Sequence, residues 1–452
     1  MMIDPAQLGD RLHRLAKLAL DSGEAASVED AIALFQTYAL HIDVGPGLAQ
    51  SPARQAALLT AINAASRAFL GGVTVAGDLD GPLAVTVAGF MDLATAAQAY
   101  GALVVEAPPA GAARLRIGPG PADGGVRTVM SGWSGGCIPG EDLDLIDDPD
   151  AFVLTGVAAA AIAIAELFQS VRGSNPAAGR RHVGVSLWDP ARSWMLDTHP
   201  GPMPSRLPAS AWIIGLGNLG QANLWSLGLL PYVAPERVEL VLQDFDRIAE
   251  SNLSTSLLTT AAMIGLPKTR AMSGWAEARG FQTRIVEQRY GSHSKRLADD
   301  PPVALCGVDN ASARAALEEA GFARIFEAGL GSGLSDFLAM RLHSFPGPRG
   351  ARAIWGGVAA PLAPTLDQPA YRALADKGAD RCGLVQLAGR TVGAPFVGAL
   401  AGALVISELV RLVNGGPSMA LVDLHLRAPG QGMALAQPPD FAFNPGSLAA
   451  TC

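Results

Sequence analysis

Apolar residues at helical spacing dominate the first part of the chain and predict three helices. The first helix carries Leu8, Leu12, Leu15 and Ala19. The second begins at Ser27, because Ser27 and Asp30 form a capping-box pattern, and it runs through Phe35. The third carries Leu58, Leu59, Ile62, Ala65 and Phe69.

Between Val73 and Met130 the pattern changes to short β-like runs. Val85–Val87 and Leu103–Val105 alternate with Gly and Pro turns, and one helical stretch follows Asp92. This alternation indicates an α/β domain, and it contains no chemical motif.

One pattern occurs twice along the chain. Residues 156–167 and 398–409 are Ala-rich stretches that begin with Gly and end in Glu-Leu at equal spacing. Each is followed by a further Gly and by a β-like segment that carries an Asp. The repeat predicts that the two halves are diverged copies of one fold. The alternative is that two Ala-rich helices coincide by composition.

The length of 452 residues favours two domains over a single core. We expect domains at 1–190 and 208–452, joined by a Pro-rich linker at 191–207. A hydrophobic fraction of 49% with 16% charged residues predicts compact globular domains.

Charge and cysteine content narrow the partners and the location. The net charge of −8 leaves no basic excess for nucleic acid or an anionic membrane, so a protein or small-molecule partner is favoured. The four cysteines form no Cys-x-x-Cys pair and no cluster at zinc spacing, so neither disulfides nor zinc are expected. The first twenty residues lack the apolar core of a signal peptide, and the uncharged run 391–407 is too short to span a bilayer. We expect a cytoplasmic protein in which 391–407 is a buried core helix.

A glycine-rich loop follows the linker. The apolar strand Ala211–Ile214 leads into Gly215-Leu-Gly217-Asn218-Leu-Gly220, and an apolar helix continues from it. In this G-x-G-x-x-G pattern, glycines let the backbone approach a phosphate or ribose, and the helix N-terminus favours the anion. Asp244 lies after the next predicted strand, about 20 residues downstream, where an acid typically binds the ribose. An NAD-dependent dehydrogenase would suit these features equally.

The residues that follow decide between the nucleotides. Asp244-x-Asp246 precedes Ser251-Asn252-Leu253 and Gly265-x-x-Lys268, and Asp309-Asn310 follows an apolar strand. This order resembles the ThiF/ubiquitin-activating superfamily. The resemblance implies a nucleotide site formed by the following residues: Gly215, Gly217, Asn218, Gly220, Asp244, Asp246, Asn252, Lys268 and Asp309.

The resemblance also implies individual roles in adenylation. Asp244 would bind the ribose, Asn252 and Lys268 the triphosphate, and Asp309 the magnesium ion. Such chemistry brings a carboxylate against an anionic α-phosphate, so Lys268 and Mg²⁺ would offset the repulsion. For Asp246, a turn-capping role is an equal alternative.

The chain departs from the family pattern S-N-L-x-R-Q, because Thr255 and Ser256 replace Arg and Gln. Related enzymes also receive an arginine from the paired copy of the fold. Arg11 and Arg14 are candidates here, although exposed helix arginines are the simpler interpretation. The zinc-binding cysteine pairs of the cofactor-sulfur members are absent, which argues against thiamine or molybdopterin biosynthesis.

Cys382 is the candidate thioester cysteine. It follows a Gly/Pro-bearing segment and precedes the predicted core helix, a placement that resembles the crossover region of activating enzymes. A loop setting beside Arg381 and Lys377 would help to lower the thiol pKa and to expose the sulfur, as a nucleophile requires. The alternative is a small buried side chain. Cys306 lies in an apolar strand, Cys137 in a Gly-rich loop and Cys452 at the last position.

Together these features predict an α/β protein of two tandem ThiF-like, doubly wound (Rossmann-like) domains, the N-terminal one degenerate and inactive. The resemblance extends to the activating component of bacterial Bil-type antiphage conjugation operons. It implies that the chain uses ATP and Mg²⁺ to adenylate the C-terminal glycine of a ubiquitin-like protein and then forms a thioester for transfer to a conjugating enzyme. A peptide or small-molecule adenylyltransferase and a non-catalytic binding module are alternatives, and a homodimer is left open.

Overall fold

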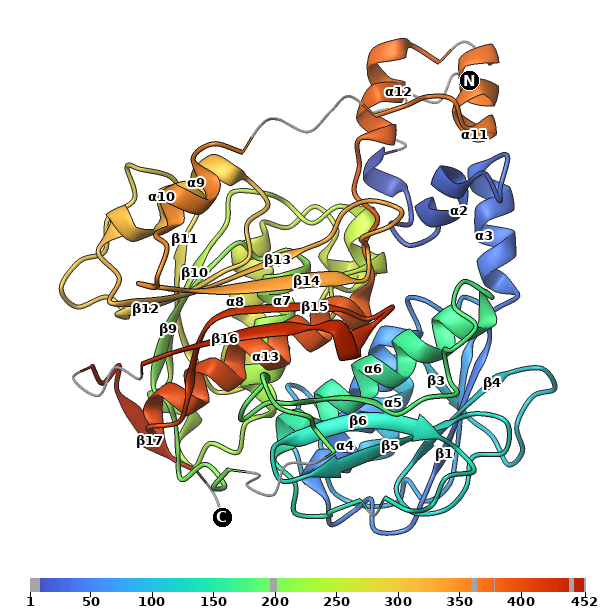
Figure 1. The fold of residues 1–452 in the computed structure, drawn as a ribbon, viewed down its shortest axis with the longest axis horizontal. Helices are drawn as coiled ribbons and strands as arrows, with labels where there is room; N and C mark the ends of the chain where they lie inside the picture. Colours follow the sequence, from blue (N-terminus) through green and yellow to red (C-terminus); the bar gives the residue numbers. More distant parts are fainter. Residues whose placement is uncertain are drawn as a thin grey trace.

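The computed structural model describes residues 9–145, 147–195, 201–358, 364–377, 379–438 and 443–450. Two large mixed sheets, each covered by helices, lie side by side and correspond to the two parts of the sequence (Figure 1). A small helical lobe, which carries Cys382, stands at one end beside the N-terminal helices.

The N-terminal half contains a seven-stranded sheet in the order β3-β2-β1-β4-β5-β6-β7. Its first five strands are parallel, and β6 and β7 are antiparallel additions at one edge. The elements are α2 Lys17–Ser22, α3 Val28–Gln36, β1 Leu40–Val44, α4 Pro52–Ala65, β2 Val73–Ala76, α5 Leu93–Ala99, β3 Ala102–Val104, β4 Ala113–Ile117, β5 Val126–Ser131, β6 Ser134–Pro139, α6 Val153–Val171 and β7 Val183–Ser186.

The C-terminal half repeats this arrangement in an eight-stranded sheet, β11-β10-β9-β12-β13-β14-β15-β16. Five parallel strands are again followed by antiparallel ones, and a two-stranded sheet joins β17 to β8. The strands are β8 Arg206–Pro208, β9 Ser210–Ile214, β10 Glu239–Gln243, β11 Gln282–Val286, β12 Val303–Cys306, β13 Arg324–Leu330, β14 Ala339–Phe345, β15 Ser418–His425, β16 Met433–Gln437 and β17 Ser447–Ala449. The helices are α7 Asn218–Leu229, η1 Pro235–Arg237, η2 Glu250–Ser254, η3 Ala261–Met263, α8 Lys268–Ala278, α9 Ala311–Ala315, η4 Leu317–Ala320, α10 Ala351–Trp355, α11 Pro369–Asp376, α12 Arg381–Ala388, α13 Pro395–Val413 and η5 Pro429–Gln431.

The two sheets share one strand order over seven strands, and the C-terminal sheet adds β16. This shared order confirms the predicted fold class and explains the sequence repeat. The repeated helices are α6 and α13, and the first glycine of each allows close helix packing. A Cβ atom on Gly156 would overlap the carbonyl oxygen of Ala53 in α4, and one on Gly398 would overlap the Asn218 side chain at the start of α7. The same small residue therefore performs the same packing role in both halves.

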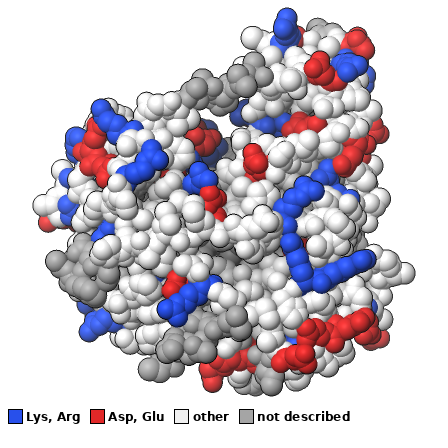
Figure 2. All heavy atoms as spheres, in the orientation of Figure 1, with Lys and Arg blue, Asp and Glu red and all other residues white. Residues whose placement is uncertain are grey.

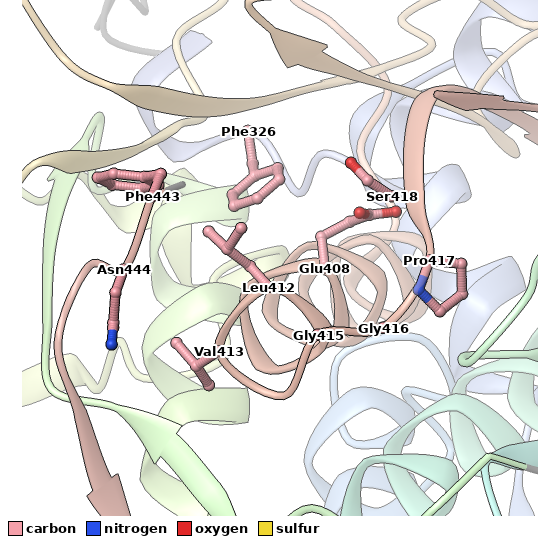
Figure 3. A pocket seen from close by; sticks show the side chains of 10 residues that line it. All are labelled: Phe326, Glu408, Leu412, Val413, Gly415, Gly416, Pro417, Ser418, Phe443 and Asn444. Carbon is pink, nitrogen blue, oxygen red and sulfur yellow. The ribbon is translucent and has the colours of Figure 1, made fainter. Parts of the chain in front are cut away.

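The glutamates of the repeat are buried and paired with arginine. Glu166 contacts Arg181 at 2.6 Å, and Glu408 pairs with Arg411. Glu408 borders a cavity of about 190 Å³, and its carboxylate points toward Ser418 (Figure 3). This cavity adjoins the C-terminal end of α13, opposite to the end that packs on the glycine-rich loop. It is therefore separate from the predicted nucleotide site.

The two halves share one hydrophobic core in which α6 packs on α13. Phe168 and Phe396 meet there with ring centroids 5.6 Å apart. Among the described residues these two helices are long and apolar enough to cross a membrane, but 94% and 89% of their most apolar windows are buried inside the protein. They are core helices, as expected for residues 391–407.

Three local predictions are corrected. The run Val85–Val87 is a loop whose valines are buried without joining a strand. The first predicted helix is interrupted between residues 12 and 16, because the His13 side chain accepts the Ala16 N–H and the Arg14 N–H is donated to Ser254. Cys137 lies on strand β6 rather than in a loop.

Candidate active site

The glycine-rich loop joins β9 to α7 at the carboxyl ends of the parallel strands. Gly215 has a φ of +85°, which L side chains rarely adopt. A Cβ on Gly220 would overlap the carbonyl oxygen of Gly215, so α7 can begin this close to the strand only with glycine. Around Gly217 the space is open. The loop therefore leaves its outer side accessible and its inner side tightly packed.

Asp244 fixes the loop from the neighbouring strand. One carboxylate oxygen accepts the N–H of Leu216 at 2.7 Å, and the other accepts the N–H of Asp246 at 2.8 Å. A carboxylate oxygen can accept a second hydrogen bond, so Asp244 retains capacity for ribose hydroxyls.

Lys268 begins α8 and faces the same edge of the sheet. Its ammonium group lies 3.0 Å from Asp246, and its backbone N–H is donated to the carbonyl of the same residue. The lysine side chain is 11% exposed, whereas that of Asp246 is 49% exposed. The structure thus brings these two predicted site residues together as an ion pair, with the carboxylate on the solvent side.

Three further predicted residues lie on separate segments of the C-terminal half. The side chain of Asn252 accepts the Ala249 N–H at 2.9 Å within η2. Asp309 is exposed just beyond β12, and a Cβ on Gly307 would lie 2.7 Å from Leu219, so the end of β12 packs on the start of α7. Asn218 carries a buried side-chain oxygen that has no hydrogen-bond partner among the described residues.

Arg14, from the N-terminal half, reaches the Ser251–Ser254 segment. Its N–H is donated to Ser254 Oγ at 3.0 Å, and its guanidinium lies 3.4 Å from Ser251 Oγ. Burial, together with nearby Arg390, lowers the pKa of Arg14 to about 10. Arg11 instead is exposed and lies 3.8 Å from Glu250. Of the two candidate arginines, the structure brings Arg14 to the predicted site.

Thr255, which stands where the family pattern has arginine, does not face the predicted site. Thr255 is buried, and a Cβ on Gly393 would lie 2.7 Å from its methyl group. The segment that precedes α13 therefore packs on Thr255 and leaves it facing the interior.

Cys382 is exposed on α12, so it lies on a helix rather than in a loop. Asp380 caps this helix by accepting the Gly383 N–H at 2.8 Å. Cys137 and Cys306 are buried; burial raises the pKa of Cys306 to about 12 and that of Cys137 well above its usual range. Cys452 lies outside the described residues.

The lobe that carries Cys382 rests on the N-terminal helices. The Tyr371 hydroxyl of α11 donates to Asp21 at 2.5 Å, and Lys17 contacts the same carboxylate. Burial raises the pKa of Tyr371 and lowers that of Lys17. This buried polar cluster was not predicted, because it joins residues 350 positions apart.

The corresponding loop of the N-terminal half, Gly45-Pro46-Gly47, is occupied by a side chain of its own domain. Arg54 of α4 donates to the carbonyls of Pro46 and Gly47 at 3.3 and 3.4 Å and pairs with Asp147 at 2.7 Å. Both charged side chains are almost fully buried. The guanidinium thus lies where the C-terminal half has an open loop.

Comparison with known proteins places the chain. Residues 39–187 match the model of the BilD N-terminal domain, and residues 207–416 match that of the BilD C-terminal domain. The bacterial E1-like protein BilD of Collimonas sp. (strain OK412) is 44% identical over 416 residues, which cover 91% of this chain and 90% of that protein. The chain belongs to the BilD family. Membership of this E1-like family supports adenylyltransferase-type chemistry for the site.

Solved structures resemble the BilD-family chain only in part. Escherichia coli MccB in complex with MccA-N7isoAsn has a TM-score of 0.33 at 12% identity, and the match covers 51% of this chain and 64% of MccB. E. coli tRNA N6-threonylcarbamoyladenosine dehydratase, TcdA, has a TM-score of 0.29 at 15% identity over 45% of this chain and 85% of that protein.

Proposed function

We propose that this chain uses ATP to adenylate the C-terminal carboxylate of a ubiquitin-like protein and then receives the acyl group on Cys382. The observation that supports this most directly is the grouping of the glycine-rich loop, Asp244 and the Lys268–Asp246 pair in a member of an E1-like family. The proposed setting is the cytoplasm, with a conjugating enzyme as the next acceptor.

In the first step, a carboxylate oxygen of the partner attacks the α-phosphorus of ATP. A new P–O bond forms, the bond to the β-phosphate breaks, and pyrophosphate leaves. Lys268 would neutralise the phosphates after leaving Asp246, which can turn to solvent because half of it is already exposed. Asp244 would orient the ribose, and Asn252 and Asn218 would lie along the phosphates.

A divalent cation fits this arrangement. Asp309 and Asp246 offer exposed carboxylates beside the loop, and oxygen ligands are those that Mg²⁺ prefers. The ion would supply charge neutralisation for the phosphates. Among the described residues no three His, Cys, Asp or Glu side chains are clustered, so Mg²⁺ would be held jointly by protein and nucleotide rather than by a protein cage.

Arg14 would take the role of the family arginine, whose position in this chain is occupied by Thr255. It lies at Ser251 and Ser254, next to Asn252, and its guanidinium has no ion pair among the described residues. A guanidinium suits a pyrophosphate leaving group, because it can donate two parallel hydrogen bonds. The N-terminal half would thus complete the site without binding a nucleotide itself.

In the second step, the Cys382 thiolate attacks the carbonyl carbon of the acyl adenylate. A C–S bond forms, the C–O bond to AMP breaks, and AMP leaves with the electron pair. Exposure of Cys382 on a capped helix supports this role, since the other described cysteines are buried.

The first step is tested by Mg²⁺-dependent exchange of pyrophosphate into ATP, in the presence of a ubiquitin-like partner with a free glycine tail. We expect Lys268→Ala to lower the exchange rate by about 100-fold or more, because one charge that stabilises the transition state is lost. Arg270→Ala is the matched control: it removes an exposed cation, paired with Glu287, from the same helix. Unchanged exchange in Lys268→Ala would exclude this assignment.

The second step is tested by non-reducing electrophoresis of enzyme, ATP and tagged partner. We expect a thiol-sensitive adduct that Cys382→Ala abolishes while pyrophosphate exchange continues. Cys382→Ser should trap an oxyester that survives thiol reagents. If the parent chain makes adenylate but never an adduct, the protein acts instead as a peptide or small-molecule adenylyltransferase.

A further inference from the structure

Arg67 stands at the junction of the two halves, just beyond α4, with its side chain directed into the C-terminal half. One terminal nitrogen donates to the carbonyls of Leu257 and Thr259 at 3.3 and 3.2 Å. The other donates to Asn63, whose own amide donates to the Leu257 carbonyl at 3.0 Å. An arginine and an asparagine of the N-terminal half thus hold the 257–259 loop of the other half by hydrogen bonds.

The 257–259 loop is connected to the glycine-rich loop through Gln221. Gln221 of α7 accepts the Leu258 N–H at 3.0 Å and contacts the Thr259 hydroxyl at 3.0 Å. The same amide group donates to the Leu216 carbonyl at 3.1 Å. Leu216 in turn donates its N–H to Asp244. A continuous series of hydrogen bonds, fully buried around Gln221, therefore runs from Arg67 to the peptide that Asp244 fixes.

The same loop continues the Asn252 segment. The Ser256 N–H bonds to the Asn252 carbonyl at 2.9 Å, and the Thr259 N–H bonds to Ser256 at 3.2 Å. Through this loop, Arg67 is joined to the segment that carries Asn252, one of the residues of the predicted phosphate site.

The chemistry of Arg67 argues against a purely stabilising role. It is largely buried, and burial lowers its pKa to about 10. Among the described residues it has no carboxylate partner, and its Nε finds no acceptor. A buried charge without an ion pair is costly, and an apolar residue would fill an interface at lower cost. Its forked donors, in contrast, can hold two carbonyls at a fixed separation.

We propose that Arg67 is a positioning residue through which the N-terminal half holds the nucleotide-binding loops of the C-terminal half in their binding geometry. This inference rests on the proposed function, because it assumes that these loops bind ATP. It assigns the N-terminal half a second contribution, independent of Arg14: without Arg67, the 257–259 loop, Gln221 and the glycine-rich loop lose a common anchor.

The test is calorimetric titration of the full-length chain with MgATP. We expect Arg67→Ala to weaken ATP binding by about 10-fold or more, the equivalent of one or two hydrogen bonds to a charged group. Arg67→Lys keeps the charge but not the fork, and it should bind ATP with intermediate affinity. Thr60→Val is the matched control: it removes the 2.9 Å hydrogen bond to Trp225 from the same interface without touching the 257–259 loop.

Hydrogen exchange separates positioning from general stability. In Arg67→Ala, amides in 253–260 and 213–218 should exchange faster, whereas Thr60→Val should leave those segments as in the wild type. Wild-type ATP affinity in folded Arg67→Ala, or in Arg67→Lys should the alanine variant not fold, would overturn the inference. Absence of ATP binding by the wild-type chain would instead contradict the proposed function.

Discussion

His13 shows how a single buried group can couple the site to pH. Burial lowers its pKa from 6.5 to about 4, although hydrogen bonds to backbone groups oppose the shift. In the native protein the imidazole is therefore neutral, and its Nδ1 accepts the Ala16 N–H. This neutral ring fixes the turn that delivers Arg14.

We expect this histidine to make the protein less stable in acid. The unfolded chain binds a proton on His13 below pH 6.5, whereas the native chain does so only below about pH 4. The free energy of unfolding should thus decrease as the pH is lowered from about 6.5 to about 4, by about 3 kcal/mol in total. Urea titrations at pH 7, 5.5 and 4.5 measure the effect, and the pH dependence should be shallower in His13→Gln. Equal pH dependence in the two proteins would contradict the assignment.

At the residue scale, the sequence could predict groups that are close together along the chain. The glycine-rich loop, Asp244, Asp246 and Lys268 lie within one βαβα stretch, and their order carries the family pattern. Arg67 could not be predicted, because it contacts a loop 190 positions away and a lone arginine has no signature. Which side chain of the N-terminal half contacts the 257–259 loop depends on tertiary packing alone.

At the element scale, the repeat glycines of α6 and α13 give a matched pair of substitutions. Gly156→Ala would press on the backbone of Ala53, which cannot yield, whereas Gly398→Ala would press on the end of the Asn218 side chain, which can turn. We expect Gly156→Ala to cost about 1–3 kcal/mol of stability by overpacking.

Gly398→Ala should lower the free energy of unfolding by less than Gly156→Ala does. It should nevertheless weaken ATP binding, because it moves Asn218. Urea unfolding and nucleotide titration of both variants separate the two effects. Gly274 on α8 has open space around it, so Gly274→Ala serves as a control that gains up to about 1 kcal/mol from helix propensity. Equal losses of ATP affinity in both repeat variants would contradict the assigned packing roles.

Helices and strands with continuous apolar sequences could be predicted, whereas strands interrupted by charged or polar residues could not. The repeat helices and the strand before the glycine-rich loop follow from continuous apolar runs. Strand β1 was missed because His41 and Asp43 interrupt it; both are satisfied locally, His41 by Thr74 at 2.8 Å and Asp43 by Arg114 at 2.6 Å. Such pairing exists only once the neighbouring strands have assembled.

At the scale of the whole molecule, the two halves have become unequal. On the face in Figure 2, acidic and basic side chains are interspersed and large areas carry neither, consistent with a chain of modest net charge. The asymmetry lies instead in the two loops, of which one is open and the other is occupied by Arg54.

We therefore expect one nucleotide per chain. Calorimetric titration with MgATP should give a stoichiometry near one, because the guanidinium of Arg54 takes the space and the backbone carbonyls of the N-terminal loop. Photolabelling with an azido-ATP analogue, followed by peptide mapping, should mark only residues beyond 207. Two bound nucleotides, or labelled peptides from 39–187, would show that the N-terminal half retains a site.

The Arg54–Asp147 pair also bears on how such a chain can evolve. Asp147 accepts the Met130 N–H as well as the arginine, so both charges are embedded in the packing of their domain. Loss of either partner alone would leave the other as an unpaired buried charge and would lower the free energy of unfolding by about 3–5 kcal/mol. Reopening the N-terminal loop thus requires at least two coordinated mutations, because either single substitution would destabilise the N-terminal half. The difference between the open loop of one half and the occupied loop of the other would therefore persist through its contribution to stability alone, even where a second nucleotide site would do no harm.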